Sequence, residues 1–374
     1  MSSVLPPYGA APRTLFGPFF APIYGALLGR LYGMGARVRV AAYRQGWLRQ
    51  RRLGHPVISV GNLTAGGTGK TPLVRWIAGR LLGRGLRPAI LIRGYRRRRG
   101  PDAIVIPPKL DRAPEPREVG DEAAWLARAF PEVPIGVSAD RFQTGRLIEE
   151  NYAVDVFVLD DGFQHLPLAR DLDVVALDAT RGISDRDILP AGLQREPCSA
   201  LARAGLVVLT RAELADPARL ENSVRRINSG VQTVRARTRL DHLLELTGPK
   251  TLPPESFIGQ PVHAFCGIGN PDAFFRDLRL WGFDVVRESV FPDHHVYRDL
   301  SFARATRAAG ANSVAVLVTT EKDAMNLAGM NLGEAGVPVV ACAVRLDLGD
   351  DEPVLDELLF ATASGPGSRA ESPV

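Results

Sequence analysis

VISVGNLTAGGTGKT (residues 57–71) joins an apolar, β-branched run to a glycine-rich loop that ends in Lys70 and Thr71. The segment that follows, PLVRWIAGRLLG (72–83), carries apolar residues at the spacing of one helix face. The order strand, glycine-rich loop, helix predicts a phosphate-binding loop, because the loop N–H groups and the positive end of the helix then face the same anion. Thr64 stands where the consensus G-x-x-x-x-G-K-[ST] has its first glycine.

The residue types in this loop fit the binding of ATP and Mg²⁺. Glycine lets the backbone curl around phosphate oxygens with no side chain in the way. The side chain of Lys70 can reach the β- and γ-phosphates, and the hydroxyl group of Thr71 can ligate Mg²⁺. We therefore predict that ATP binds the loop residues Thr64, Ala65, Gly66, Gly67, Thr68, Gly69, Lys70 and Thr71.

Further apolar runs follow at intervals that leave room for helices between them. Near-continuous runs of Val, Ile and Leu are typical of strands that are buried on both faces of a parallel sheet. We therefore expect an α/β fold of the P-loop NTPase type, with a doubly wound, mostly parallel sheet. The predicted strands after the loop are 88–92, 103–107, 133–137, 154–160, 172–178 and 204–210.

The pattern changes near residue 230. VQTVRARTRLDHLLEL (231–246) alternates enough to indicate extended strands, and a second, smaller α/β lobe follows it, with strands expected from VHAFCGI (262–268) to VPVVACAVRL (337–346). The small, polar and Pro/Gly-rich end of the chain predicts a disordered tail. The predicted division is an N-terminal apolar and basic helical segment at 1–50, a P-loop core at 51–230, an extended linker at 231–260, the smaller lobe at 261–362 and the tail at 363–374.

The overall composition is that of a globular protein. The chain has 374 residues, of which 45% are hydrophobic and 23% are charged, and it can bury a sizeable core. Its formal net charge of +5 favours an anionic partner. No helix-turn-helix, zinc-finger or RNP-type pattern accompanies this charge, so we predict no nucleic-acid partner. The three cysteines lie far apart without a C-x-x-C pair, which fits a reducing compartment.

The N-terminal region combines apolar and basic residues. The uncharged stretch TLFGPFFAPIYGALLG (14–29) is shorter than the ~20 apolar residues that span a bilayer, and it contains Pro18 and Pro22. A series of arginines follows it between positions 30 and 52. Apolar side chains beside arginines favour a helix in the headgroup region of an anionic membrane surface. A helix that packs on the protein's own core, with its arginines in solvent, is the alternative.

Two acidic motifs stand at positions where a nucleotide site needs carboxylates. VDVFVLDDGFQH (154–165) places Asp160 and Asp161 at the end of an apolar strand, where a carboxylate can hold Mg²⁺ across from the phosphate loop. The sequence does not separate the two. VGDEAAW (119–125) places Asp121 at the start of a helical segment, as a helix cap or as a base that takes the proton of an acceptor hydroxyl group.

Two further motifs lie in the second lobe. FPDHHVY (291–297) sets His294 and His295 beside Asp293, which indicates either a histidine tuned by a carboxylate or a buried polar cluster. No H-x-x-x-H or nearby cysteine accompanies them, which disfavours a zinc site. The residues 321–323 in VTTEKDAMN (318–326) follow a predicted strand and form either a strand-end site or a helix N-terminus.

In chain order, these motifs together resemble those of the tetraacyldisaccharide 4′-kinase family, along about residues 57–325. The apolar and basic N-terminus is also similar to the membrane-associated entry helix of that family. The motifs that carry the resemblance are VGNLTAGGTGKTP, RGY, VGDE, DR (140–141), DDGFQH, RDLDVVALD, ILPAGLQREP, FPDHH and TEKDA.

The resemblance implies transfer of the γ-phosphate of ATP to the 4′-hydroxyl group of a tetraacylated glucosamine disaccharide 1-phosphate. The product would be lipid IVA, made at the cytoplasmic face of the bacterial inner membrane by a peripheral or monotopic enzyme. The resemblance further implies that Asp121 serves as the base and is coupled to His294, with Lys70 as a catalytic residue at the phosphates. Thr71, Asp160 and Asp161 would lie at the Mg²⁺.

The alternative is a P-loop ATPase that acts as a nucleotide switch on a protein partner. Such proteins carry a KGGxGKT loop, whose extra lysine reaches the phosphate of a neighbouring subunit. Ala65 occupies the position of that lysine here, which disfavours a switch. We therefore predict no obligatory protein partner.

Overall fold

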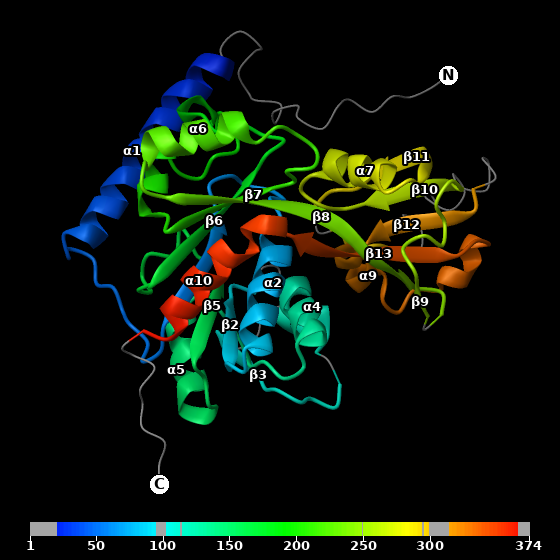
Figure 1. The fold of residues 1–374 in the computed structure, drawn as a ribbon, viewed down its shortest axis with the longest axis horizontal. Coiled ribbons are helices and arrows are strands. Elements are labelled where there is room, and N and C mark those ends of the chain that lie inside the picture. The colour runs from blue at the N-terminus through cyan, green and yellow to red at the C-terminus, as the bar shows by residue number, and fades with distance from the viewer. Residues whose placement is uncertain are drawn as a thin grey trace.

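The computed structural model places the described strands in one sheet with helices on both faces (Figure 1). The described residues are 21–94, 102–112, 114–248, 250–293, 295–298 and 314–365. Thirteen strands belong to the sheet in this part of the chain. Their bounds are β1 Val57–Asn62, β2 Pro88–Ile92, β3 Ala103–Ile106, β4 Ile135–Ser138, β5 Val156–Asp160, β6 Leu172–Asp178, β7 Leu206–Thr210, β8 Gln232–Glu245, β9 Thr251–Leu252, β10 Pro261–Cys266, β11 Asp284–Val290, β12 Val316–Thr320 and β13 Val339–Asp347.

The strand order confirms the predicted mostly parallel sheet. From one edge to the other the order is β11-β10-β12-β13-β8-β7-β6-β1-β5-β2-β4-β3, and β9 pairs with β8 outside this path. β1 runs parallel to both β5 and β6, with Val60 opposite Asp160. Antiparallel pairs join β3 to β4 and β8 to β13 and β9. Since β1 and β5 are parallel, the residues after both strands lie at the same edge of the sheet.

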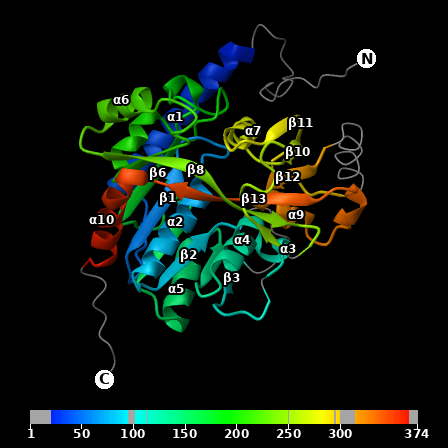
Figure 2. The ribbon, with the colours of Figure 1, turned by 45° about the vertical axis from the view of Figure 1, so that its right-hand side comes forward.

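A single long strand connects the two lobes. The first part of β8, Gln232–Ala236, pairs in parallel with β7, and the part from Arg237 onward pairs antiparallel with β13. Figures 1 and 2 show β8 crossing from the lobe that contains β6 to the lobe that contains β12. The lobes therefore share one sheet, with β8 and β13 at the junction. The predicted boundaries of core, linker and second lobe stay predictions.

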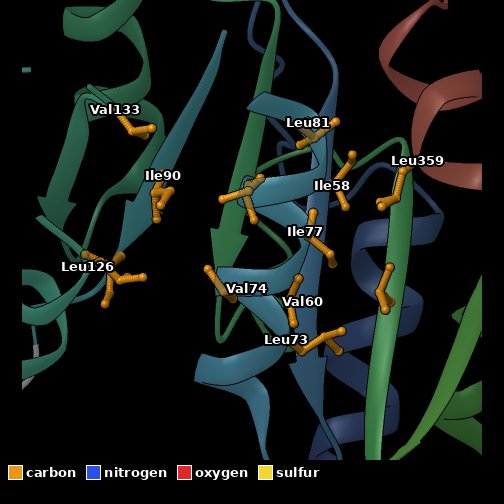
Figure 3. Close-up of a cluster of buried hydrophobic side chains, with 14 of the residues drawn as sticks. Ile58, Val60, Leu73, Val74, Ile77, Leu81, Ile90, Leu126, Val133 and Leu359 are labelled. Atoms are coloured by element: carbon orange, nitrogen blue, oxygen red, sulfur yellow. The ribbon is translucent and has the colours of Figure 1, made fainter. Parts of the chain in front are cut away.

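Helices cover the sheet, and the core lies beneath them. Ile58 and Val60 of β1 are fully buried against Leu73 and Ile77 of α2 (Figure 3). Burial of each such side chain contributes about 1.5–3 kcal/mol. The helix bounds are α1 Ala21–Arg44, α2 Lys70–Gly83, α3 Pro116–Val119, α4 Asp121–Ala129, α5 Arg141–Asn151, α6 Ala218–Ile227, α7 Pro271–Leu280, α9 Glu321–Leu327 and α10 Glu352–Ala363. After β13 the chain returns to the first lobe, where α10 contacts α2.

The first helix lies along the outside of the first lobe (Figure 1). Its buried Gly29 and Gly33 pack closely on Ile188, since a Cβ atom added to either glycine would lie 3.1 Å from an Ile188 atom. Its other face exposes large apolar side chains, among them Leu31 and Val38. Within the described residues, α1 and the other helices lack the length and hydropathy of a membrane span.

Candidate active site

The phosphate-binding loop lies between β1 and α2, as the sequence order predicts. Gly66 and Gly69 have φ angles of 98° and 79°, a region that favours glycine. The Asn62 side chain donates a hydrogen bond of 2.7 Å from Nδ2 to Oγ1 of Thr68, and the Thr210 hydroxyl group donates one of 2.9 Å to the Thr68 carbonyl oxygen. Side chains at the ends of β1 and β7 therefore hold the loop in shape.

Lys70 and Asp161 form an ion pair at the start of α2. The distance from Lys70 Nζ to Asp161 Oδ1 is 3.4 Å. Arg195 Nη1 donates to both carboxylate oxygens of Asp161, at 2.8 and 2.7 Å. Burial raises the pKa of Asp161, but Lys70 and Arg195 together outweigh burial and hold it below its usual value. Asp161 is thus an ionised group that two cations already contact.

Asp160, unlike Asp161, is buried and has a carboxylate oxygen without a hydrogen-bond partner in the described part of the chain. It is 3% exposed, and its Oδ1 atom accepts no hydrogen bond from any residue that the structure describes. Burial, followed by the nearby charges of Glu122 and Asp161, raises the pKa of Asp160 to about 7 against the opposing effect of Lys70. A buried carboxylate oxygen without a donor fits a cation, since Mg²⁺ prefers oxygen ligands.

The rest of a magnesium site would come from the nucleotide and from water. No group of three or more His, Cys, Asp or Glu side chains is placed to hold a metal in the described part of the chain. Thr71 lines the same cleft as Asp160, and its hydroxyl group is an oxygen donor. The residues present therefore fit a Mg²⁺ ion that arrives with the phosphates of ATP.

Asp121 is the first residue of α4, directly after Gly120. Asp121 and Glu122 line the cleft together with Lys70 and Asp160. The N-terminus of a helix favours a negative charge, which suits a carboxylate that works in its ionised form. The structure thus brings the predicted base to the same cleft as the predicted phosphate-binding residues.

The cleft has a volume of about 1190 Å³ and extends into the second lobe. There the side chains of Ile268, Phe274 and Trp281 form a mostly apolar wall. Asp277 lies in this wall and is 5% exposed, and burial raises its pKa to about 7. Its Oδ1 atom and the Trp281 Nε1 atom have no hydrogen-bond partner among the described residues. This end of the cleft therefore offers apolar surface with a few polar atoms, as ligand pockets commonly do.

The two lobes touch at the phosphate-binding loop itself. Arg211 donates from Nη1 to the carbonyl oxygen of Gly67 at 2.9 Å and to the carboxylate of Asp178. Asn270, from the second lobe, donates to the same Asp178 oxygen at 3.0 Å. A Cβ atom added to Gly269 would lie 2.6 Å from the Gly67 nitrogen, so the two backbones approach closely.

Basic side chains line the part of the cleft that lies beside α1. Arg141 is 5% exposed, and burial, followed by the charge of Arg93, lowers its pKa to about 10. Its Nη1 atom lies 3.3 Å from Nδ1 of His165. Burial, and then Arg141, lowers the pKa of His165 to about 3, so His165 is neutral at physiological pH. Arg39 of α1 lines the same part of the cleft.

The histidine motif is described only in part. His294 lies outside the described residues, as does Tyr95 of the RGY motif. Asp293 lines the cleft. His295 stacks on Phe291 with a centroid distance of 4.8 Å, and it therefore belongs to an aromatic cluster.

Several residues that line or support the cleft carried no predicted role. Asn62 holds the phosphate-binding loop. Its position, a polar amide at the end of a mostly apolar strand, could have indicated this role from the sequence. Arg195 lies within ILPAGLQREP, but only the fold shows that it pairs with Asp161. Arg141 belongs to the DR motif at 140–141, but the motif alone assigned it no role; Arg211 reaches the cleft from the end of β7, and nothing in its local sequence indicates it.

The chain is similar to known proteins over most of its length. The tetraacyldisaccharide-1-P 4'-kinase family matches residues 23–363 of the chain. A tetraacyldisaccharide 4'-kinase of Geobacter metallireducens is 39% identical over 333 residues, which are 88% of this chain and 95% of the relative. One from Pelobacter propionicus is 38% identical over 328 residues, which are 88% and 89% of the two chains.

A solved structure of a kinase is also similar to this chain. The crystal structure of an "apo" form of LpxK from Aquifex aeolicus in complex with ATP matches with a TM-score of 0.71 and 30% sequence identity. The match covers 92% of this chain and 98% of that one. On the extent of these matches, the chain belongs to the tetraacyldisaccharide-1-P 4'-kinase family.

Proposed function

We propose that this kinase transfers the γ-phosphate of Mg²⁺-bound ATP to the 4′-hydroxyl group of tetraacyldisaccharide 1-phosphate at a membrane surface, giving lipid IVA in lipid A biosynthesis. The observation that carries the proposal is one cleft lined by Lys70, by the Asp160–Asp161 pair and by Asp121. These groups are what transfer to a hydroxyl acceptor requires: a cation at the phosphates, carboxylates for a metal and a base.

The loop Thr64–Thr71 binds the phosphates of ATP through its N–H groups and the N-terminus of α2. Lys70 lies 3.4 Å from Asp161 and contacts the β- and γ-phosphates when ATP is bound, so the two groups keep each other in place before the nucleotide arrives. Asp160 and the Thr71 hydroxyl group would hold Mg²⁺, and the ion would supply positive charge beside the transferred phosphoryl group. Of the two aspartates left open by the sequence, we assign the metal side to Asp160, because Asp161 already pairs with Arg195.

Asp121 accepts the proton of the acceptor. The 4′-oxygen forms a bond to the γ-phosphorus, the bond from that phosphorus to the β,γ-bridging oxygen breaks, and ADP leaves with the bonding electrons. The proton of the hydroxyl group passes to the Asp121 carboxylate and then to solvent. We propose that His294 is coupled to Asp121 in this role, because the FPDHH motif resembles that of the family.

The glycolipid enters from a membrane beside α1. The exposed side chains Leu27, Leu28, Leu31, Met34 and Val38 form an apolar surface on this helix, between 51% and 60% exposed. Exposed arginines lie among them. Apolar insertion and attraction to anionic lipid add together in such a helix, and we place the enzyme peripherally on the cytoplasmic face of the inner membrane.

The first experiment measures label transfer from γ-labelled ATP to a detergent-solubilised disaccharide 1-phosphate acceptor, with Mg²⁺ present and then chelated. Label in the lipid that depends on Mg²⁺ is the expected result. ATP hydrolysis with unlabelled lipid would contradict the proposal and favour a nucleotide switch.

The second experiment tests the membrane surface by flotation with vesicles of anionic phospholipid. Leu31→Glu together with Val38→Glu should reduce binding, since both side chains belong to the apolar surface of α1. Leu147→Glu is a matched control, because Leu147 is an exposed leucine on α5. An equal loss of vesicle binding in Leu147→Glu would contradict the proposal that α1 binds the membrane.

A further inference from the structure

The first turn of α9 carries two neighbouring charged side chains, of which Lys322 lines the cleft and Asp323 is buried behind it. α9 begins at Glu321, directly after β12, so Lys322 and Asp323 occupy its first turn. Asp323 is 1% exposed, whereas 29% of the Lys322 side chain is exposed. The two therefore have different surroundings and different partners.

Asp323 joins two loops of the second lobe. Its Oδ1 atom accepts from the Gly267 N–H group and from the Tyr297 hydroxyl group, each at 2.9 Å. Gly267 opens the loop that reaches the phosphate-binding loop, and Tyr297 closes the segment that contains Asp293. Tyr297 also packs edge-on against Phe291, with a centroid distance of 5.2 Å. One buried carboxylate thus joins two described segments of the second lobe that contribute residues to the cleft.

Lys322 joins the second lobe to the first. Its Nζ atom lies 3.4 Å from Oδ1 of Asp293 and 3.8 Å from Oε1 of Glu122. Glu122 follows Asp121 in the first turn of α4. An ammonium group between two carboxylates favours their approach, and without it the two negative charges would repel each other.

We infer that Lys322 is a positioning residue, which holds α4 and its Asp121 against the Asp293 segment of the second lobe, while Asp323 fixes that segment from behind. The inference rests on the proposed function, because it assigns Asp121 to the acceptor side of the reaction. Lys322 does not touch the reacting atoms in this scheme. Its charge sets the distance between the two walls of the cleft.

The test compares Lys322→Met, Lys322→Arg and Lys250→Met in the full chain. Lys250 is an exposed lysine next to β9 and serves as the matched control. For Lys322→Met we expect kcat of lipid phosphorylation to fall roughly tenfold or more, with the KM for ATP within about twofold, because the phosphate-binding loop is untouched. Lys322→Arg should restore most of kcat, since it keeps the charge.

A double-mutant cycle separates positioning from a general structural role. In a Glu122→Gln background, Lys322→Met should cost clearly less than in the parent, because one of the two carboxylates that it holds is already neutral. Equal costs in both backgrounds, or activity of Lys322→Met equal to that of Lys250→Met, would overturn the inference. A parent that transfers no label to lipid would instead overturn the proposed function, and the inference with it.

Discussion

The two walls of the cleft are built in different ways. The first-lobe wall consists of a loop between a buried strand and a helix, held by short hydrogen bonds from Asn62 and Thr210. The second-lobe wall reaches the cleft through loops and the first turn of α9, and it meets the first lobe through side chains such as Asn270 and Lys322. The first wall is therefore set by local sequence and strand pairing. The second depends on how the lobes meet at β8 and β13.

The largest effect should come from the first wall. Lys70→Ala removes the cation at the transferred phosphoryl group, and we expect kcat to fall by roughly 10³- to 10⁵-fold, the range found for removal of comparable cations. The fold should persist, because Lys70 lies at the cleft surface. Label transfer measures the loss, and the thermal midpoint serves as the control. Residual transfer above about one tenth of the parent would contradict the role of Lys70.

Asp121→Asn should have the next largest effect. Asparagine keeps the shape at the start of α4 but cannot accept the proton, so kcat should fall about 10²- to 10⁴-fold. Binding of ATP, measured by calorimetry, should stay close to that of the parent. Unchanged turnover would remove Asp121 from the role of base. Weakened ATP binding with equal kcat would place Asp121 on the nucleotide side of the cleft.

The sequence predicted most of the first wall because its signals are local. Near-continuous apolar runs located the strands. The loop at 64–71 was predicted from its motif, and Asp160 and Asp161 were predicted from their place at the end of the strand that is β5. The sequence left Asp160 and Asp161 undecided, since the difference between them is made by Arg195, which arrives from a distant loop.

The second wall was predicted in outline only. Its strands were located by the same apolar runs. The junction of β8 with β13 depends on a pairing between residues about one hundred positions apart, which no local pattern encodes. For the same reason no role was predicted for Asp277, because only the fold places this helical aspartate in the apolar wall of the cleft.

Asp277, in the second wall, should make the free energy of unfolding depend on pH. Burial raises its pKa from 3.8 to about 7, so the folded state binds this proton more tightly than the unfolded state. Its contribution to the free energy of unfolding is therefore fully present below about pH 4 and is lost as the pH rises toward 7, by up to roughly 4 kcal/mol. Asp277→Asn should remove this slope and be more stable than the parent at pH 8.

Urea unfolding between pH 4 and 8 tests this expectation. Asp272→Asn is the matched control, because Asp272 lies on the same helix and is exposed. The control should keep the slope of the parent. An Asp277→Asn variant that loses stability with rising pH as steeply as the parent would show that another group carries the slope.

The smallest expected effect concerns the contact between the two walls. In Gly269→Ala the new Cβ atom would lie 2.6 Å from the Gly67 nitrogen, so the second-lobe loop must withdraw from the phosphate-binding loop. We expect the KM for ATP to rise about tenfold while kcat changes little, since Lys70 and Asp121 keep their places. Gly79→Ala, on α2 with nothing within 4 Å of the added atom, is the control and should leave the KM unchanged. An unchanged KM in Gly269→Ala would mean that the first wall binds ATP without help from the second wall. The second wall would then contribute only to binding and positioning the acceptor.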